Sequence, residues 1–254
     1  MISKLTIKQI KSLHTKKFRK HHKMFLVEGE KFVNELLKST FSYEKIYAIK
    51  EWVDTLKSKH ILSNKVEIVT EKELSQISGL KSPNKVVAIV NDTNYKLNYA
   101  ELKKDLFLVL DKINNPGNLG TILRIADWFG IKNIVCSFDS VEYSNPKVLQ
   151  ASMGSVFRVK THYINLVKFV ENCQKKGIKL IGSSLHGDNV YEVKFPASFG
   201  LVLGNESHGV SKDVSSKLDY SISIPKYNNR KIDSLNVAIA SSIILSEVIR
   251  VTQK

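Results

Sequence analysis

Cysteine is scarce in this chain of 254 residues, which has only Cys136 and Cys173. The two cysteines have neither CxxC nor metal-ligand spacing, so the sequence predicts no disulfide framework and no metal site. Cys136 ends the apolar run 134–136, where a free cysteine is usually a small buried core residue. This use of cysteine fits the reducing environment of the cytoplasm.

Long hydrophobic runs are also missing. No stretch approaches the roughly 18–20 apolar residues that a membrane-spanning helix needs. The lysine-rich start of the sequence lacks the apolar core of a secretory signal. We therefore expect no membrane partner and a cytoplasmic location. The length suggests one large domain or two smaller ones, with a substantial core in either case.

Acidic residues are absent from residues 1–23, which hold eight lysines and arginines of a chain with a formal net charge of +15. Such a basic segment favours a polyanionic partner, nucleic acid first. An anionic membrane is a weaker alternative, because the aromatic residues do not share a helical face opposite the lysines. A solvated basic face, or a lysine-rich composition, would also explain the charge. The candidates for contacting nucleic-acid phosphates are Lys16, Lys17, Arg19, Lys20 and Lys23.

The glycine-rich fingerprints of common nucleotide-binding folds are absent as well. Gly204 and Gly209 have the spacing of a P-loop, but Val210 stands where the phosphate-binding lysine should be. No Gly-x-Gly-x-x-Gly occurs in the chain. A P-loop NTPase and a dinucleotide-dependent dehydrogenase are therefore both disfavoured.

Apolar runs alternate with helical patterns, which predicts two α/β units. The first has expected strands at 24–27, 46–49, 66–69 and 86–90 and helices at 30–37, 51–58 and 71–77. The second has expected strands at 106–110, 134–136, 179–182, 200–203 and 221–224 and helices at 119–129, 146–153 and 235–250. Residues 106–110 are all apolar, as in a buried strand of a parallel sheet. We place the domains at 1–95 and 105–254, with a linker at 96–104.

Three motifs in the second unit put small or amide residues where an apolar run ends, which is where a backbone can approach a ligand. They are 114–124 (NNPGNLGTILR), 201–211 (LVLGNESHGVS), and Ile224-Pro225 followed by 234–238 (SLNVA). Asn118 lies at the mouth of a helix that leaves a parallel strand. Arg124 projects away from the apolar stripe of that helix. It is either a solvated arginine or a guanidinium directed at a phosphate or a developing oxyanion.

The second and third motifs leave similar alternatives open. Glu206 directly follows a strand and either caps the next helix or shapes a site. Pro225 ends a strand, since proline has no N–H to donate. Ser234 is a good N-cap for the last helix, with Asn236 in the first turn. That helix is apolar around much of its circumference, which predicts burial in a core or a subunit interface.

In this order and at these separations, the motifs resemble those of the SpoU family of RNA 2′-O-ribose methyltransferases. Phe25-Leu26-Val27-Glu28-Gly29 with the helix after it, and 82–88 (SPNKVVA), resemble the L30e-like RNA-binding domain of that family. The resemblance therefore covers nearly the whole chain. It implies a small L30e-like α/β domain over 1–95 and a methyltransferase domain over 105–254, whose parallel sheet is tied into a trefoil knot. It also implies a homodimer with the active site near the interface.

The resemblance implies S-adenosylmethionine as the cofactor, gripped mainly by the backbone of Leu203, Gly204, Ile224, Pro225, Ser234 and Leu235. It implies Asn118, Arg124, Glu206 and Asn236 as catalytic residues. An arginine stays protonated, so we expect Arg124 to hold phosphate and stabilise a developing alkoxide rather than act as a base. Asn118 would orient Arg124 or the ribose, and Glu206 and Asn236 would fix the pocket. The reaction needs a 2′-hydroxyl, which excludes DNA as the substrate.

One segment departs from the family pattern. Residues 226–233 (KYNNRKID) form a connection that is longer, more basic and free of glycine, so Arg230 and its basic neighbours either contact RNA phosphate or are solvated. The two-domain form fits rRNA better than tRNA, because the simplest tRNA-modifying relatives lack the L30e-like part. The alternative from another class is a non-catalytic RNA-binding or ribosome-assembly factor. The presence of all four polar active-site residues argues against that alternative.

Overall fold

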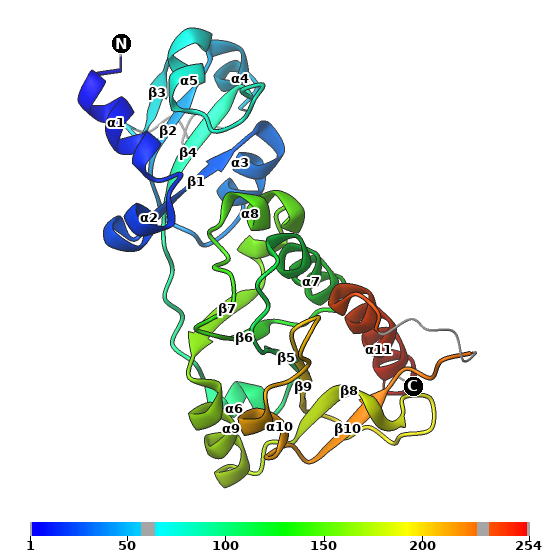
Figure 1. Cartoon of the computed structure of the whole chain (residues 1–254). Helices are drawn as coiled ribbons and strands as arrows, with labels where there is room; N and C mark the ends of the chain where they lie inside the picture. Colours follow the sequence, from blue (N-terminus) through cyan, green and yellow to red (C-terminus); the bar gives the residue numbers. More distant parts are fainter. Residues whose placement is uncertain (1, 57–63, 228–233, 253–254) are drawn as a thin grey trace. The chain divides into compact units, whose positions relative to one another are not determined.

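The computed structural model describes residues 2–56, 64–227 and 234–252, which form two compact units (Figure 1). One unit contains Met1–Thr93 and Ser144–Phe157, and the other contains Asn94–Tyr143 and Arg158–Lys254. Both are α/β, as the sequence predicts. Within the described residues, no helix combines the length and the apolar composition that crossing a bilayer requires.

The first unit is built on a four-stranded sheet with the order β1-β4-β2-β3. Its strands are β1 (Met24–Glu28), β2 (Tyr43–Ala48), β3 (Val66–Ile68) and β4 (Val86–Asn91); β2 and β3 are parallel, and the other pairs are antiparallel. Its helices are α1 (Lys4–Ser12), α2 (Lys16–His22), α3 (Glu30–Leu37), α4 (Lys50–Asp54), α5 (Glu71–Ile77) and α8 (Pro146–Ser152), with a 3-10 helix, η2, at Ser155–Phe157. Each strand predicted between 24 and 90 occurs, with ends shifted by one to three residues.

An aromatic cluster attaches the segment 144–157 to the first unit. Phe25 and Phe157 both pack edge to face on Phe41, with ring centroids 6.4 and 5.3 Å apart. All three rings are buried. The predicted division into continuous domains did not include this arrangement, because a local pattern in 144–157 does not reveal which sheet it packs on.

The second unit is built on six parallel strands in the order β10-β8-β9-β5-β6-β7. They are β5 (Phe107–Leu110), β6 (Asn133–Ser137), β7 (Lys160–Ile164), β8 (Leu180–Asn189), β9 (Gly200–Leu203) and β10 (Tyr220–Ser223). The helices are α6 (Tyr99–Leu102), α7 (Pro116–Trp128), α9 (Leu166–Lys175), α10 (Lys212–Ser215) and α11 (Val237–Thr252). The parallel sheet is confirmed, whereas β7 and α9 have no counterpart in the sequence prediction.

Alternate residues of the central strands bury both faces of this sheet. Phe107, Val109 and Val202 pack with Phe169 of α9 and Val214 of α10 on one face. Figure 1 shows α7 and α11 side by side on the other face. Burial on both sides explains why these strands read as continuous apolar runs.

Both cysteines lie in the second unit and are free and buried, as expected for Cys136. Burial raises the pKa of the Cys136 thiol and raises that of Cys173 to about 12. Both side chains are therefore thiols near neutral pH and behave as small core residues.

Strand β8 contains an excursion. Gly182 pairs with Ser221, but the next pair is Asp188 with Ile222, so residues 183–187 loop out of the ladder. Gly187 closes the excursion against β10, where a Cβ would lie 2.5 Å from the carbonyl carbon of Ser221. A residue with a side chain does not fit at this position without moving backbone.

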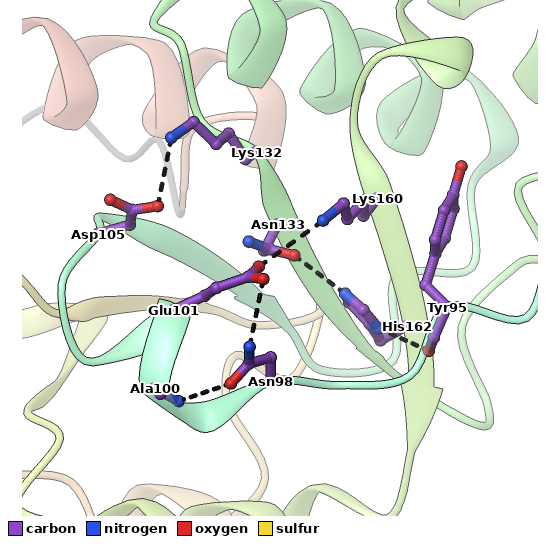
Figure 2. Close-up of polar contacts among 9 residues, drawn as sticks. All are labelled: Tyr95, Asn98, Ala100, Glu101, Asp105, Lys132, Asn133, Lys160 and His162. Carbon is purple, nitrogen blue, oxygen red and sulfur yellow. Dashed lines mark hydrogen bonds and ion pairs between the residues drawn. The ribbon is translucent and has the colours of Figure 1, made fainter. Parts of the chain in front are cut away.

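The segment predicted as a linker, 96–104, is folded onto the second unit. It contains α6, and Leu102 is buried in the core of that unit. Figure 2 shows the polar contacts that hold the segment on the edge of the sheet. His162 Nδ1 lies 3.2 Å from the Tyr95 carbonyl oxygen, and the Lys160 ammonium lies 3.6 Å from the Glu101 carboxylate.

Candidate active site

The first two motifs begin at the centre of the parallel sheet, where β5 and β9 pair. Leu110 and Leu203, the last residues of these strands, are partners in the ladder. Strands β6 and β7 lie on one side of this pair, and β8 and β10 lie on the other. Open parallel sheets bind ligands beyond the carboxyl ends of their strands at such a switch point. The topology therefore brings the two motifs together.

Local capping starts α7 inside the first motif. The Asn115 Oδ1 accepts hydrogen bonds from the N–H groups of Gly117 (2.8 Å) and Asn118 (3.3 Å), and Pro116 occupies the first helical position. The helix begins three residues before the predicted 119–129. Asn118 therefore lies in the first turn, facing the sheet edge at which the strands end.

Polar contacts join the loop after β5 to its neighbours. Lys112 adopts a left-handed backbone with φ 57°; its N–H donates to Ser137 Oγ (2.9 Å), and its carbonyl accepts from Asn205 Nδ2 (3.0 Å). The buried Asp111 carboxylate accepts from the N–H of Ser211 (2.8 Å). Neither Asp111 nor Asn205 was among the predicted site residues. The available signal was an acidic residue placed directly after the fully apolar run of β5.

The loop after β9 closes as a tight turn. Asn205 and Gly209 exchange two backbone hydrogen bonds of 3.0 and 2.8 Å, and Gly209 has a positive φ of 65°. A Cβ on Gly204 would lie 2.0 Å from the carbonyl carbon of Gly209, so only glycine fits there. The turn holds Glu206 at its tip.

Asn118, Glu206 and Asn236 form a connected cluster, which we call the polar triad. The Asn118 Nδ2 donates to the Glu206 carboxylate, and the Asn236 Nδ2 donates to Asn118 Oδ1 at 3.0 Å. Each residue comes from a different motif, and Asn118 lies 118 residues before Asn236 in the chain. The fold therefore brings together three of the four predicted catalytic residues.

Arg124, the fourth, stays outside the triad. It is exposed on α7, and among the described residues it has no hydrogen bond or ion pair. An exposed guanidinium near the switch point remains available to an anionic ligand.

A cavity of about 920 Å³ adjoins the triad, and Glu206 forms part of its wall. It is lined by all six predicted cofactor-binding residues: Leu203, Gly204, Ile224, Pro225, Ser234 and Leu235. The excursion of β8 also lines it through Ser183, Ser184, Leu185 and His186, which the sequence analysis missed. The glycines at 182 and 187 that flank this excursion were the only local sign of it.

The N-cap of the last helix is Asn236, so the prediction of Ser234 as the cap is wrong. The Asn236 Oδ1 accepts from the N–H groups of Ala238 (2.9 Å) and Ile239 (3.3 Å). Serine and asparagine are both good N-caps, so the burial of the residues that follow them decides where α11 starts. Val237 and Ala238 are buried, and α11 begins with them.

The predicted RNA-binding residues of α2 and its end fall into two groups. Lys16, Lys17, Lys20 and Lys23 are exposed. Arg19 is 5% exposed, and its Nη1 donates to the carbonyl oxygens of Leu13 (3.2 Å) and His14 (2.9 Å). Arg19 therefore has a structural role in the first unit. Arg230 lies outside the described residues.

Family models match both parts of the chain. Residues 105–246 match the SpoU rRNA Methylase family, and residues 4–88 match the MRM3-like substrate binding domain. Each match contains the motifs from which the resemblance was inferred.

Individual proteins resemble the chain over most of its length. The 23S rRNA (guanosine(2553)-2′-O)-methyltransferase RlmP of Bacillus subtilis is 32% identical over 94% of this chain and 94% of its own. The 23S rRNA (uridine(2479)-2′-O)-methyltransferase of Streptomyces viridochromogenes is 32% identical over 67% of this chain and 61% of its own. The AdoMet-bound rRNA methyltransferase of Sinorhizobium meliloti has a TM-score of 0.86 and 26% identity, covering 98% of this chain and 96% of that structure.

Proposed function

The chain belongs to the SpoU rRNA methylase family, and we propose that it transfers a methyl group from S-adenosylmethionine to a ribose 2′-hydroxyl of ribosomal RNA. The observation that carries this proposal is the polar triad, in which three motifs meet beside a cavity large enough for the cofactor. A chain that had kept the fold but lost the chemistry would not need to keep these three side chains connected.

The cavity fits S-adenosylmethionine in size and chemistry. Its volume of about 920 Å³ lies within the range of roughly 300–1,000 Å³ for small-molecule sites. Leu203, Leu218 and Ile224 offer apolar contact to an adenine ring, and Gly204 forms part of the cavity wall. Ser183 and Ser234 offer hydroxyl groups to polar parts of the ligand. When bound, the cofactor supplies a methyl group on a positively charged sulfur.

The residues of the chain position the ribose and stabilise charge. Asn118 is fixed on both sides by Glu206 and Asn236, so it can orient the ribose. Arg124 brings a permanent positive charge, which stabilises the 2′-oxygen as its proton leaves and binds an adjacent phosphate. A guanidinium has no lone pair to accept that proton, so Arg124 is not the base.

Three observations support ribosomal RNA as the substrate. The match to a substrate-binding domain covers residues 4–88 of the first unit, and two of the named relatives are 23S rRNA methyltransferases. Lys16, Lys17, Lys20 and Lys23 are exposed basic residues of that unit. The proposal assigns RNA binding to 1–95 and methyl transfer to 105–254. A DNA substrate is excluded because the reaction needs a 2′-hydroxyl.

We also propose a homodimer in the cytoplasm, with the second sheet tied into the trefoil knot of the family. Trp128 on α7 and Ile239 on α11 are 85% and 52% exposed, and the two helices lie side by side. Exposed apolar side chains on adjacent helices suit a subunit interface. Light scattering should give twice the mass of 28.8 kDa, and replacing both residues with lysine should give the monomer.

The test of the proposed function is transfer of labelled methyl from S-adenosylmethionine to unmodified total RNA, separated into rRNA and tRNA and then mapped. We expect the label in one 2′-O-methyl nucleotide of rRNA. Label in tRNA alone would contradict the assigned substrate. No transfer despite measured cofactor binding would favour a non-catalytic RNA-binding or ribosome-assembly factor.

Asn236→Asp tests the triad within this assay. The aspartate still caps α11 but loses the amide that donates to Asn118, so we expect transfer to fall about tenfold with little change in Tm. Asn165→Asp is the matched control, because Asn165 caps α9 through the same kind of contact. An unchanged rate in Asn236→Asp would remove the triad from the mechanism.

A further inference from the structure

Helix α2 buries only one of its side chains, and that side chain is charged. Arg19 reaches the carbonyl oxygens of Leu13 and His14, at the end of α1. The other six residues of α2 are exposed. A surface helix normally buries an apolar stripe, so packing does not explain why α2 exposes all of its side chains except Arg19.

The exposed side chains of α2 include an aromatic pair. The ring of Phe18 is 40% exposed and stacks on that of His22, one helical turn later, with centroids 6.2 Å apart and planes inclined by 14°. His21 lies edge-on to His22, with centroids 4.9 Å apart. We call Phe18 and His22 the aromatic platform. A phenylalanine exposed on an otherwise basic helix costs solubility and contributes nothing to the core.

The helix that carries the aromatic platform is basic. Lys16, Lys17, Lys20 and Lys23 are exposed on this helix or at its end, and no acidic residue occurs before Glu28. Lysines and an exposed stacked ring on one short helix combine the two features that bind single-stranded nucleic acid: charge for the phosphates and a flat surface for a base.

We propose that the aromatic platform binds an unpaired base of the RNA substrate, while the exposed lysines of the same segment bind phosphates of that strand. This proposal deepens the proposed function, because it rests on RNA being the substrate. It specifies a substrate with a loop or bulge at the position that meets α2, since a paired base keeps its faces inside the duplex. A membrane is a poorer occupant, because Phe18 is the only apolar side chain that α2 offers.

The experiment compares two labelled RNAs of equal length, a hairpin with an unpaired loop and a continuous duplex. Wild-type protein should bind the loop RNA more tightly. Phe18→Ala should weaken loop binding about tenfold and leave duplex binding unchanged, because stacking of one base is removed while the phosphate contacts stay. Phe18→Trp should restore loop binding. Leu5→Ala is the matched control, since Leu5 on α1 is 67% exposed and forms no platform.

The remaining outcomes separate this proposal from the proposed function. If Phe18→Ala binds each of the two RNAs as tightly as wild type does, the platform is overturned, even if methyl transfer is normal. A lost preference for loop RNA in Phe18→Ala would support the platform even if no methyl transfer is detected. Binding to phosphatidylserine vesicles that depends on Phe18, with RNA binding unaffected, would assign the surface to a membrane and overturn the proposal.

Discussion

The switch point of the second unit and helix α2 of the first unit are built in opposite ways. At the switch point, Asn205 binds Lys112 and Asp111 binds Ser211, so segments about a hundred residues apart in the chain hold each other in place. Helix α2 is fixed by Arg19, whose partners are five and six residues away. A site that transfers a chemical group needs its side chains held in place by contacts from several sides. A surface that binds a flexible polyanion needs only exposed, charged side chains. Substitutions should therefore act differently in the two regions.

The largest effect on cofactor binding is expected at Gly204. Gly204→Ala places a Cβ against the backbone of Gly209, so the turn that forms the cavity wall must open. We expect S-adenosylmethionine binding, measured by calorimetry, to weaken at least about a hundredfold, in line with an overpacking cost of about 3 kcal/mol.

Gly130→Ala is the control for this substitution. Gly130 also has a positive φ, 71°, but a Cβ there meets nothing within 4 Å. Its cost should be backbone strain alone, about 1 kcal/mol, with cofactor binding unchanged. Equal cofactor binding in Gly204→Ala and wild type would show that the turn is more pliable than its contacts indicate.

Arg124→Ala should lower methyl transfer about 10²–10³-fold, because the variant has no positive charge to stabilise the developing oxyanion. Cofactor binding should stay within a few-fold, since Arg124 does not line the cavity. Single-turnover transfer and calorimetry on the same preparation separate the two quantities. Full activity in Arg124→Ala would remove this residue from the mechanism.

Substitutions in the basic surface of α2 should have smaller effects on RNA binding, and these effects should depend on the salt concentration. Replacing Lys16, Lys17, Lys20 and Lys23 with alanine should weaken RNA binding. It should also flatten the plot of log affinity against log salt, by up to about 0.9 for each phosphate that the protein no longer neutralises. The Tm should not change, because these side chains are exposed.

Arg19→Ala tests the buried basic residue of α2 against the exposed lysines of the same helix. It removes two charge-assisted hydrogen bonds of a buried side chain, so the free energy of unfolding should fall by about 2 kcal/mol. If Arg19→Ala has a normal Tm but its RNA affinity depends less on salt, then Arg19 contacts RNA phosphate and does not stabilise the first unit.

The same contrast explains what could be predicted from the sequence. The buried strands of the second sheet and the three motifs are visible locally, because apolar runs and amide-rich turns occupy consecutive residues. Strand β7 was missed because it includes Thr161 and His162, two polar residues that are buried in the fold. Thr161 pairs with Ile134 in the ladder, and the His162 ring contacts the Tyr95 carbonyl oxygen, so both depend on partners distant in sequence. The excursion 183–187 and the attachment of 144–157 likewise depend on contacts that no local pattern records.

Residues of the cavity and the triad could therefore be predicted from the sequence, but the contacts between these residues could not. Family resemblance named Asn118, Glu206 and Asn236, and the structure adds that they bind one another. Asn205 and Asp111 were missed because their side chains bind backbone groups of segments distant in sequence.

The smallest predicted effect concerns His162, which ties residues 94–105 to the sheet (Figure 2). Burial lowers the pKa of His162 below its usual value, and Lys160 lowers it further, against the opposing effects of the Tyr95 carbonyl and Glu101. The unfolded chain therefore takes up a proton first as the pH falls below about 6.5. The stability due to neutral His162 is complete above that pH and is lost as the pH falls toward the folded-state pKa.

Urea unfolding between pH 5 and 8 measures this dependence. One such group adds a slope of at most about 1.4 kcal/mol per pH unit to the free energy of unfolding. His162→Gln keeps polar contacts toward Tyr95 and Asn133 but does not titrate, so its curve should be flatter than that of wild type below pH 6.5. Parallel curves would mean that carboxylates elsewhere set the acid sensitivity. A flatter curve would show that the segment between the two matched domains, expected as a linker, is held by a contact that acid weakens.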